Sequence, residues 1–474
     1  MFSNKHYVDA VKGVSWLFIS TVVSRLVVFS AQIFIGHLLS PKDIGLYAVA
    51  LSVTNFLGAI RNGGTLQWLV YRGAKYKEYL SDSTQYALLF NLICMIATFV
   101  ALFFIDEGPD RRTIQILCFV IAISIPISTF GAIYRIELLI QNRFKQSSIL
   151  STISTVLWQL EILYAAYNGY GPFSYIVPIL LQAIFDGLLG WYFVRSWPIT
   201  RPVLDSSKFR FFFKDTKLIM LAAFALSLAL TGQYFVIGLF ASAATVGYFF
   251  FGFQNAYNVF ILINVATESV LPSVFTKIES KEVQNKTVVD LLKTFNIIIC
   301  PVIALLILLS PYIFTFIWKD KWMQSVFVFQ CTLMAIPALL LISFVKSLHE
   351  ARGQWRYRFV LMFLYGVGTI AVTAFGASLD NLFLISFLLF IFYFTLGLLI
   401  IYHMSGLLEI RFLSLLMVYL MPILVSIVSS LAFILVFSWL SLPVMTKVIL
   451  SCVAYLIAQL IFNYIIYRNF WVQS

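Results

Sequence analysis

The sequence has 474 residues, of which 61% are hydrophobic and only 11% are charged. An ordinary soluble domain carries roughly 25% charged residues, so this composition excludes a soluble globular protein, a disordered chain and a coiled coil. A membrane β-barrel is disfavoured because its strands alternate polar and apolar residues, whereas the apolar runs here are continuous. The net charge of +12 fits the excess of Lys and Arg in cytoplasmic loops, so no nucleic-acid partner is expected. The sequence therefore predicts an all-α polytopic membrane protein.

Apolar runs separated by charged or turn-rich breaks predict the membrane spans. A span needs roughly 20 apolar residues, and about 14 runs meet this length. An even number of spans places both termini on one side of the membrane. The splits at 169–172 and at 241–244 are the least clearly marked. The predicted spans are residues 14–37, 44–68, 85–105, 113–134, 148–168, 172–194, 217–240, 245–271, 288–310, 323–348, 358–378, 381–404, 412–438 and 444–467.

The distribution of Lys and Arg predicts the orientation. With the N-terminus in the cytoplasm, 25 of these residues fall on the cytoplasmic side and six on the outer side, and Arg25 within the first span completes the 32. Such an asymmetry is typical of membrane proteins that follow the positive-inside rule. We therefore expect a multi-pass membrane protein with both termini in the cytoplasm.

A weak internal repeat divides the chain. Residues 35–75 align with 237–277 at an offset of 202, which pairs Ser40 with Ser242 and Gly45 with Gly247. Parallel repeats of this kind are related by an axis along the membrane normal, and substrate binds between them. The predicted organisation is a six-helix lobe at 1–194, a cytoplasmic linker at 195–216, a second six-helix lobe at 217–404 and two additional helices in 405–474.

Two stretches resemble a known family. The segment VSWLFISTVVSRLVVFSAQIFIGHLLSPKDIGLYAVALSVTNFLGAIRNGG, with its Ser24-Arg25 pair and the turn 39–45, resembles the bacterial polysaccharide transporters, and so does SPYIFTFIWKDKW at 310–322. These are O-antigen, capsule and exopolysaccharide flippases of the multidrug/oligosaccharidyl-lipid/polysaccharide exporter superfamily.

The resemblance implies a V-shaped, two-lobed bundle without covalent chemistry. It would move undecaprenyl-pyrophosphate-linked sugar repeat units, as in lipopolysaccharide biosynthesis, from the inner to the outer leaflet by alternating access. A polysaccharide polymerase and a chain-length regulator are possible partners.

Arginines inside predicted spans are the first candidate site residues. A charge at the bilayer centre costs about 2.5–3.5 kcal/mol on insertion scales, so it needs a partner, a wet cavity or a ligand. Arg25 shares a helix face with Gln32, and a guanidinium there can hold a diphosphate through bidentate hydrogen bonds. The alternative is an ion pair of Arg25 with Asp186 or Glu161. Arg61 is the second candidate, and its alternative is snorkelling to the inner headgroups.

Amides in the second and eighth spans extend this candidate binding site. Asn55 and Asn62 form a stripe beside Arg61, and Gln254 and Asn258 share one face of the eighth span. Because these spans are equivalent in the repeat, both lobes are predicted to offer a polar wall to sugar hydroxyls.

Three carboxylates are candidates for coupling transport to H⁺ or Na⁺. Asp186, Glu161 and Glu268 lie within predicted spans, where burial raises a carboxyl pKa and a nearby Arg lowers it. A static salt bridge is the alternative for Asp186 and Glu161, and a solvated helix end is the alternative for Glu268.

Sequence motifs of enzymes and metal sites are missing. There is no HExxH, Walker or GxSxG motif, the five cysteines have no paired spacing, and the four histidines are scattered near helix ends. We therefore expect no catalytic residue, no metal site and no cofactor, apart from a possible coupling ion. A multidrug/cation antiporter of the same architecture remains an alternative, although central arginines favour an anionic substrate. A membrane-embedded polysaccharide polymerase or ligase is less favoured, because the largest outer segment, about 310–325, is short.

Overall fold

The computed structural model describes residues 4–58, 60–104, 110–200, 206–277, 280–439, 441 and 443–466, and these residues form helices and turns without any strand. Most helices are long enough to cross a bilayer, which follows from the long apolar runs. The helices are α1 (Asn4–Leu38), α2 (Pro41–Leu57), η1 (Arg61–Gly64), α3 (Thr65–Arg72), η2 (Gly73–Lys75), α4 (Tyr76–Ala101), η3 (Leu102–Phe104), α5 (Arg111–Ile140), α6 (Phe144–Tyr167), η4 (Gly171–Tyr175), α7 (Ile176–Val194), α8 (Ser206–Ser227), η5 (Leu228–Gly232), α9 (Gln233–Phe240), α10 (Ala243–Lys277), α11 (Lys281–Trp318), η6 (Lys319–Trp322), α12 (Met323–Ala351), α13 (Trp355–Ala377), α14 (Leu382–Leu408), α15 (Phe412–Trp439) and α16 (Val444–Ile466).

The described helices account for the predicted spans. Twelve stretches are long and apolar enough to cross a membrane, and the bent pair Pro41–Leu57 with Arg61–Val70 adds a thirteenth. One of the twelve, Lys281–Ala351, comprises α11 and α12, which pack against each other and are joined by η6. This division gives the fourteen spans predicted from sequence. Both weakly marked splits are confirmed, since α6 ends at Tyr167 and α9 ends at Phe240.

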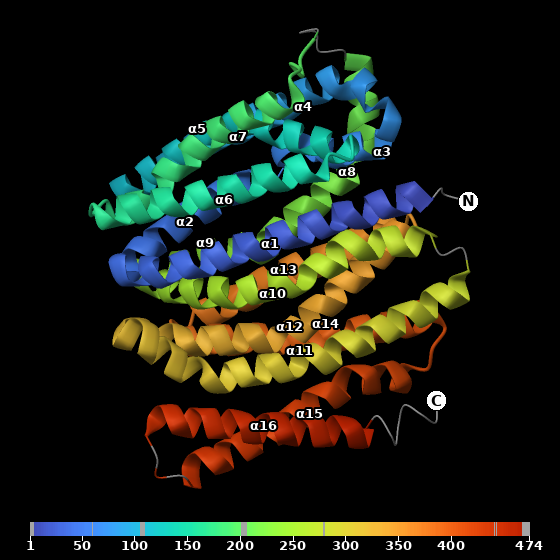
Figure 1. Ribbon diagram of the computed structural model, residues 1–474. Coiled ribbons are helices and arrows are strands. Elements are labelled where there is room, and N and C mark those ends of the chain that lie inside the picture. Colours follow the sequence, from blue (N-terminus) through green and yellow to red (C-terminus); the bar gives the residue numbers. More distant parts are fainter. Residues whose placement is uncertain are drawn as a thin grey trace.

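The helices run roughly parallel to one another in a single bundle (Figure 1). The start of α1 and the end of α16 lie at the same end of the bundle, which we call the terminal end, and the opposite end is the far end. We call α1–α7 the first half and α8–α14 the second half. Helix α10 packs against both α1 and α2, so it carries much of the contact between the halves. At the edge of the second half, α15 packs on α11 and α14, and α16 packs on α15.

The second span is broken, contrary to the prediction of one run over 44–68. Helix α2 begins with a capping box between Ser40 and Asp43 and ends at Leu57. Asn62, Gly63 and Gly64 then have φ values of 57°, 54° and 71°, which α-helices do not accommodate. The axis consequently turns by 46° before α3. The dipeptides Asn-Gly and Gly-Gly are turn signals, and they are the sequence feature that could have predicted this break.

Helix α8 begins within the predicted linker. The linker was expected to reach residue 216, but α8 starts at Ser206 and its first turns pack on the first half. Asp215 forms an ion pair with Arg72 at 3.2 Å, and Lys208 forms one with Asp82 at 2.9 Å. An apolar cluster, the α8 cluster, joins the same helices: Trp68, Tyr86, Phe90, Phe212 and Met220. The remainder of α8 packs on α13 of the second half.

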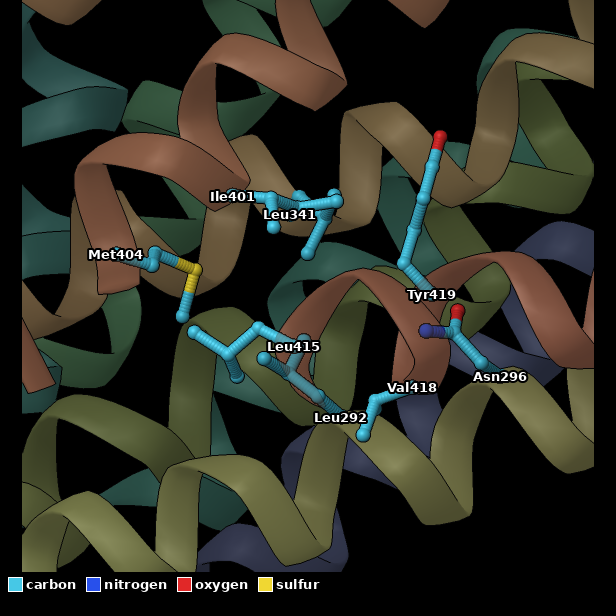
Figure 2. A pocket seen from close by; sticks show the side chains of 8 residues that line it. All are labelled: Leu292, Asn296, Leu341, Ile401, Met404, Leu415, Val418 and Tyr419. Carbon is cyan, nitrogen blue, oxygen red and sulfur yellow. The ribbon is translucent and has the colours of Figure 1, made fainter. Parts of the chain in front are cut away.

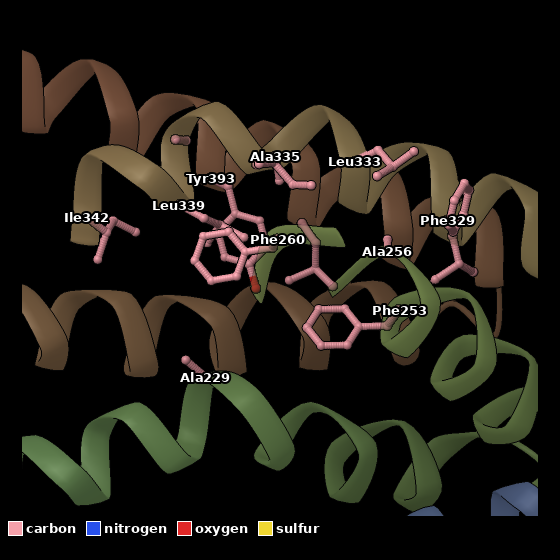
Figure 3. Packing of buried hydrophobic residues seen from close by; sticks show 14 of the residues in the cluster. Ala229, Phe253, Ala256, Phe260, Phe329, Leu333, Ala335, Leu339, Ile342 and Tyr393 are labelled. Atoms are coloured by element: carbon pink, nitrogen blue, oxygen red, sulfur yellow. The ribbon is translucent and has the colours of Figure 1, made fainter. Parts of the chain in front are cut away.

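The largest buried core lies mainly in the second half. Figure 3 shows Phe253 and Phe260 of α10 close to Leu333 and Leu339 of α12 and to Tyr393 of α14. Interlocking of large side chains across three helices holds these helices as one rigid group. Helix α15 packs against this group, and Figure 2 shows a small cavity at the contact. The cavity is lined by Leu292, Asn296, Leu341, Ile401, Met404, Leu415, Val418 and Tyr419.

Candidate functional site

Arg25 lies where the two halves meet. It is half-buried on α1, and its Nη1 donates a hydrogen bond of 3.0 Å to Oδ1 of Asn258 on α10. Its Nε is buried without a hydrogen-bond partner. The alternative considered from the sequence, an ion pair with Asp186 or Glu161, is not present among the described residues, where no carboxylate lies within ion-pair distance of Arg25. The structure therefore brings together two predicted site residues from different halves and leaves the cation with a neutral partner.

Arg61 begins the 3₁₀ turn η1 after the break in the second span. Its Nε and Nη2 are buried, and neither has a hydrogen-bond partner among the described residues. The guanidinium folds back over Gly58, where a Cβ would lie only 2.6 Å from the Arg61 Nε. Burial of these nitrogens argues against the snorkelling alternative, since a snorkelling guanidinium reaches water. Arg61 is a second, partly buried cation without a carboxylate partner in the described chain.

Asn62 is held by an asparagine that sequence reasoning missed. The Asn62 backbone N–H donates to Oδ1 of Asn91 at 2.9 Å, and Nδ2 of Asn91 donates back to Oδ1 of Asn62 at 2.9 Å. The same Nδ2 also donates to Thr129 Oγ1 at 2.7 Å. This clamp ties the break to α4 and α5 and engages the amide oxygen that was expected to meet sugar hydroxyls. The sequence feature that could have pointed to Asn91 is its position as a single Asn within an apolar span.

The remaining predicted amides are distributed over both halves. Gln32 lies buried on α1, seven residues beyond Arg25 and on the same face. Asn55 of α2 accepts a hydrogen bond of 3.2 Å on its backbone oxygen from Ser227 of α8. Gln254 of α10 donates to Tyr234 of α9 at 3.2 Å. The amides therefore flank the junction of the halves, where α1, α2 and α10 adjoin.

The three predicted coupling carboxylates have different surroundings. Asp186 of α7 pairs with Arg135 of α5 at 3.0 Å and accepts a hydrogen bond from Ser154 of α6, so it ties three helices of the first half together. Glu161 of α6 has a buried Oε2 that lacks a hydrogen-bond partner among the described residues. The side chain of Glu268 lies outside the described residues. Arg135, placed by the sequence prediction just beyond the fourth span, was missed as the partner of Asp186.

The far end is closed by contacts between the halves. The last turn of α1 leaves carbonyl oxygens without partners in the helix, as all helix ends do. Trp318 Nε1 donates to the Ile33 oxygen at 3.0 Å, Trp322 Nε1 donates to the Gly36 oxygen at 2.9 Å, and Lys321 Nζ donates to the His37 oxygen at 2.9 Å. These three donors come from the 310–322 segment. Its tryptophans and lysine therefore cap the end of α1.

Two glycines make a close contact at the far end. A Cβ at Gly45 would lie 1.7 Å from the Ala243 oxygen, and one at Gly247 would lie 1.8 Å from the Pro41 oxygen. The contact is reciprocal, because both pairs are related by the offset of 202 found in the sequence. The helix caps repeat too: Ser40 accepts from the N–H of Asp43, and Ser242 accepts from the N–H of Thr245. The two repeats thus meet at equivalent residues, as in a two-fold contact.

The histidines are less scattered than expected from the sequence. His349 on α12 and His403 on α14 are 54 residues apart in sequence, yet their Nε2 atoms are 3.2 Å apart. This pair could not be predicted from the sequence, because neither spacing nor periodicity relates the two positions. Glu137 was also missed: it is buried on α5, where Tyr76 donates to it at 3.1 Å.

Comparison with solved structures identifies the fold. The lipid II flippase MurJ in its inward closed conformation matches with a TM-score of 0.74 at 16% identity, covering 96% of this chain and 99% of that chain. An inward-facing multidrug resistance MATE family transporter of the MOP superfamily matches with a TM-score of 0.64 at 13% identity, over 82% and 94%. A MOP superfamily transporter from Pyrococcus furiosus, described as having a binding pocket of reverse polarity, matches with a TM-score of 0.58 at 14% identity, over 84% and 96%. No curated protein matches the sequence.

Sequence comparison agrees with the fold. The family model described as "Polysaccharide biosynthesis protein" matches residues 34–327, which is more than half of the chain. This region includes the far-end glycines and the tryptophans that cap α1. The chain therefore belongs to the polysaccharide biosynthesis protein family, and it has the fold of the MOP-superfamily transporters.

Proposed function

We propose that this protein is a flippase that moves undecaprenyl-pyrophosphate-linked oligosaccharide repeat units from the inner to the outer leaflet by alternating access. The observation that carries the proposal is Arg25, a half-buried guanidinium between the halves whose hydrogen-bond partner, Asn258, is neutral. A desolvated cation without a counter-charge is costly, and an anionic ligand would supply that charge. A diphosphate fits because guanidinium donors match phosphate oxygens in pairs.

Arg61 supports an anionic substrate in the same way. Two of its nitrogens are buried without hydrogen-bond partners. A second phosphate or a sugar oxygen would accept hydrogen bonds from them when the substrate is bound. The amides Gln32, Asn55 and Gln254 would then meet sugar hydroxyls at the junction of the halves. Asn62 contributes less to such binding, because its side chain is engaged by Asn91.

We also propose that an ion gradient supplies the energy for transport. Of the carboxylates, Glu161 is the better candidate for carrying H⁺ or Na⁺, because Asp186 is already paired with Arg135. The proposed setting is the bacterial inner membrane with both termini cytoplasmic. A polymerase and a chain-length regulator would act next on the product in O-antigen, capsule or exopolysaccharide assembly, and no catalytic residue is assigned to this chain.

The test is substitution of Arg25 in cells that depend on this gene for surface polysaccharide. Arg25→Ala is expected to abolish the polysaccharide while the protein remains in the membrane, and Arg25→Lys is expected to rescue poorly because an ammonium cannot bind in bidentate fashion. Arg195→Ala is the matched control, since Arg195 is exposed and its guanidinium lies over Tyr192. Normal polysaccharide in the Arg25→Ala cells would overturn the proposal.

A multidrug/cation antiporter is the second candidate, because MATE transporters share the fold. An antiporter for organic cations would export a fluorescent cation from cells and would tolerate Arg25→Ala. Export of that cation by the wild-type protein, with unchanged surface polysaccharide in a deletion strain, would favour the antiporter.

A further inference from the structure

The histidine pair lies apart from the proposed substrate site. His349 lies near the end of α12 and His403 near the end of α14, and these helices pack against each other at the terminal end of the bundle. His349 is 1% exposed, whereas His403 is exposed. One imidazole is therefore fixed in the core, and the other covers it from the surface.

The neighbours of His349 fix the direction of its lone pair. Its Nδ1 is 2.7 Å from the Oε1 of Gln354. An amide oxygen only accepts hydrogen bonds, so Nδ1 carries the proton and Nε2 presents a lone pair towards His403. The ring of Tyr357 stacks on His349 with centroids 5.6 Å apart and an interplanar angle of 13°, which holds the ring plane. A histidine oriented through its second nitrogen is the arrangement found at metal ligands.

The spacing of the two rings fits a metal ion. When two imidazole nitrogens bind a tetrahedral metal at 2.0–2.1 Å, they lie about 3.3 Å apart. The Nε2 atoms of His349 and His403 are 3.2 Å apart, where the His403 Nε2–H donates a hydrogen bond to the His349 Nε2. A metal would bind between them once His403 carries its proton on Nδ1, with little movement of either ring. Within the described residues no third His, Cys, Asp or Glu completes a cluster. The nearby Arg352 directs its guanidinium to oxygens of Gln284 and Asn285 on α11.

We propose that His349 and His403 form a two-histidine site for a divalent transition-metal ion, with water in the remaining coordination positions. Imidazole suits Zn²⁺ and Cu²⁺, and Cu²⁺ binds such ligands more tightly. A bound ion would join the ends of α12 and α14 and brace the second half. The site is independent of substrate binding at Arg25, so either proposal can fail without the other.

The test measures metal binding by the whole protein, purified through an affinity tag that contains no histidine. Titration calorimetry with Zn²⁺ is expected to give one site per chain, and the electron paramagnetic resonance spectrum of one equivalent of Cu²⁺ is expected to show two coupled imidazole nitrogens. His403→Asn is expected to weaken Zn²⁺ binding at least tenfold and to remove one nitrogen from the Cu²⁺ spectrum. Because His403 is exposed, this variant does not depend on repacking the core.

His37→Asn is the matched control, since His37 is an exposed histidine at the far end whose role in the fold uses only its backbone oxygen. It is expected to keep the wild-type affinity and spectrum. His349→Asn should lose the site as His403→Asn does. Absence of Zn²⁺ binding by the wild-type protein, or an affinity that His403→Asn leaves unchanged, would overturn the proposal.

Discussion

The glycine contact at the far end makes a quantitative prediction about conformational equilibrium. In Gly45→Ala, the new methyl carbon would lie 1.7 Å from the backbone oxygen of Ala243. Non-bonded heavy atoms rest at about 3.5 Å, so α2 and α10 must separate by roughly 1.5–2 Å at this point. The obstructing atom belongs to the backbone, and therefore no side-chain rotation relieves the contact.

The size of the effect follows from the cost of overpacking. Forcing a methyl group into a well-packed contact costs typically about 1–3 kcal/mol. Because this cost falls on the state in which the far end is closed, the population should move roughly 5- to 150-fold towards states in which α2 and α10 are apart. Gly247→Ala should act alike, since its methyl carbon would lie 1.8 Å from the Pro41 oxygen.

Distances between spin labels measure this shift. Labels at Asn168→Cys and Ser378→Cys are placed on exposed far-end residues of the first and second half, in a chain whose five native cysteines are replaced. Gly45→Ala is expected to increase the fraction of long distances. The control is Gly406→Ala, because no heavy atom lies within 4 Å of the added carbon there. Identical distance distributions for Gly45→Ala and wild type, in detergent and in nanodiscs, would refute the reasoning.

Three further substitutions test contacts within and between the halves. Asn91→Leu leaves the amide groups of Asn62 without partners, so we expect the detergent-solubilised protein to lose about 1–3 kcal/mol of stability, seen as a lower unfolding temperature. Asp186→Ala strands the guanidinium of Arg135, and a double-mutant cycle with Arg135→Ala should therefore show coupling; additive losses would contradict the ion pair. Trp322→Phe removes one hydrogen bond to the end of α1, worth about 1 kcal/mol, and also leaves a void because Trp322 is fully buried. It should speed hydrogen exchange at the end of α1, and unchanged exchange would argue against the cap.

The spans could be predicted because hydropathy alone decides them. A run of about 20 apolar residues has few stable alternatives to a membrane helix, since its backbone groups must be paired internally. The breaks at 169–172 and 241–244 were visible as small or turn-forming residues. The repeat offset was visible too, and it correctly paired Gly45 with Gly247.

What hydropathy does not report is the path of the backbone within an apolar stretch. The break after Leu57 depends on three left-handed residues, which the hydrophobic pattern hides. Likewise, the segment before residue 217 was predicted to be a linker because it is rich in Lys and Arg. These charges lower its hydropathy and hide the apolar residues that α8 buries against the first half.

Pairing of polar side chains was only partly predictable. The faces of α1 and α10 placed Arg25 and Asn258 towards the junction of the halves, and their hydrogen bond follows from this geometry. The partner of Asp186 was not predictable, because Arg135 lies 51 residues away and no local pattern links the two. The same applies to His349 and His403, which only the packing of α12 on α14 brings together.

Helix α8 is fastened to both halves, and this restricts how the molecule can change shape. Its first turns are tied to the first half by Asp215 and the α8 cluster, whereas Ala225 lies against Gly366 of the second half. A movement of one half against the other would therefore bend or displace α8, in addition to changing the contacts of α10 with α1 and α2. The π-helical turn Leu228–Gly232 directly follows, and its wider winding makes it the natural point of flexure.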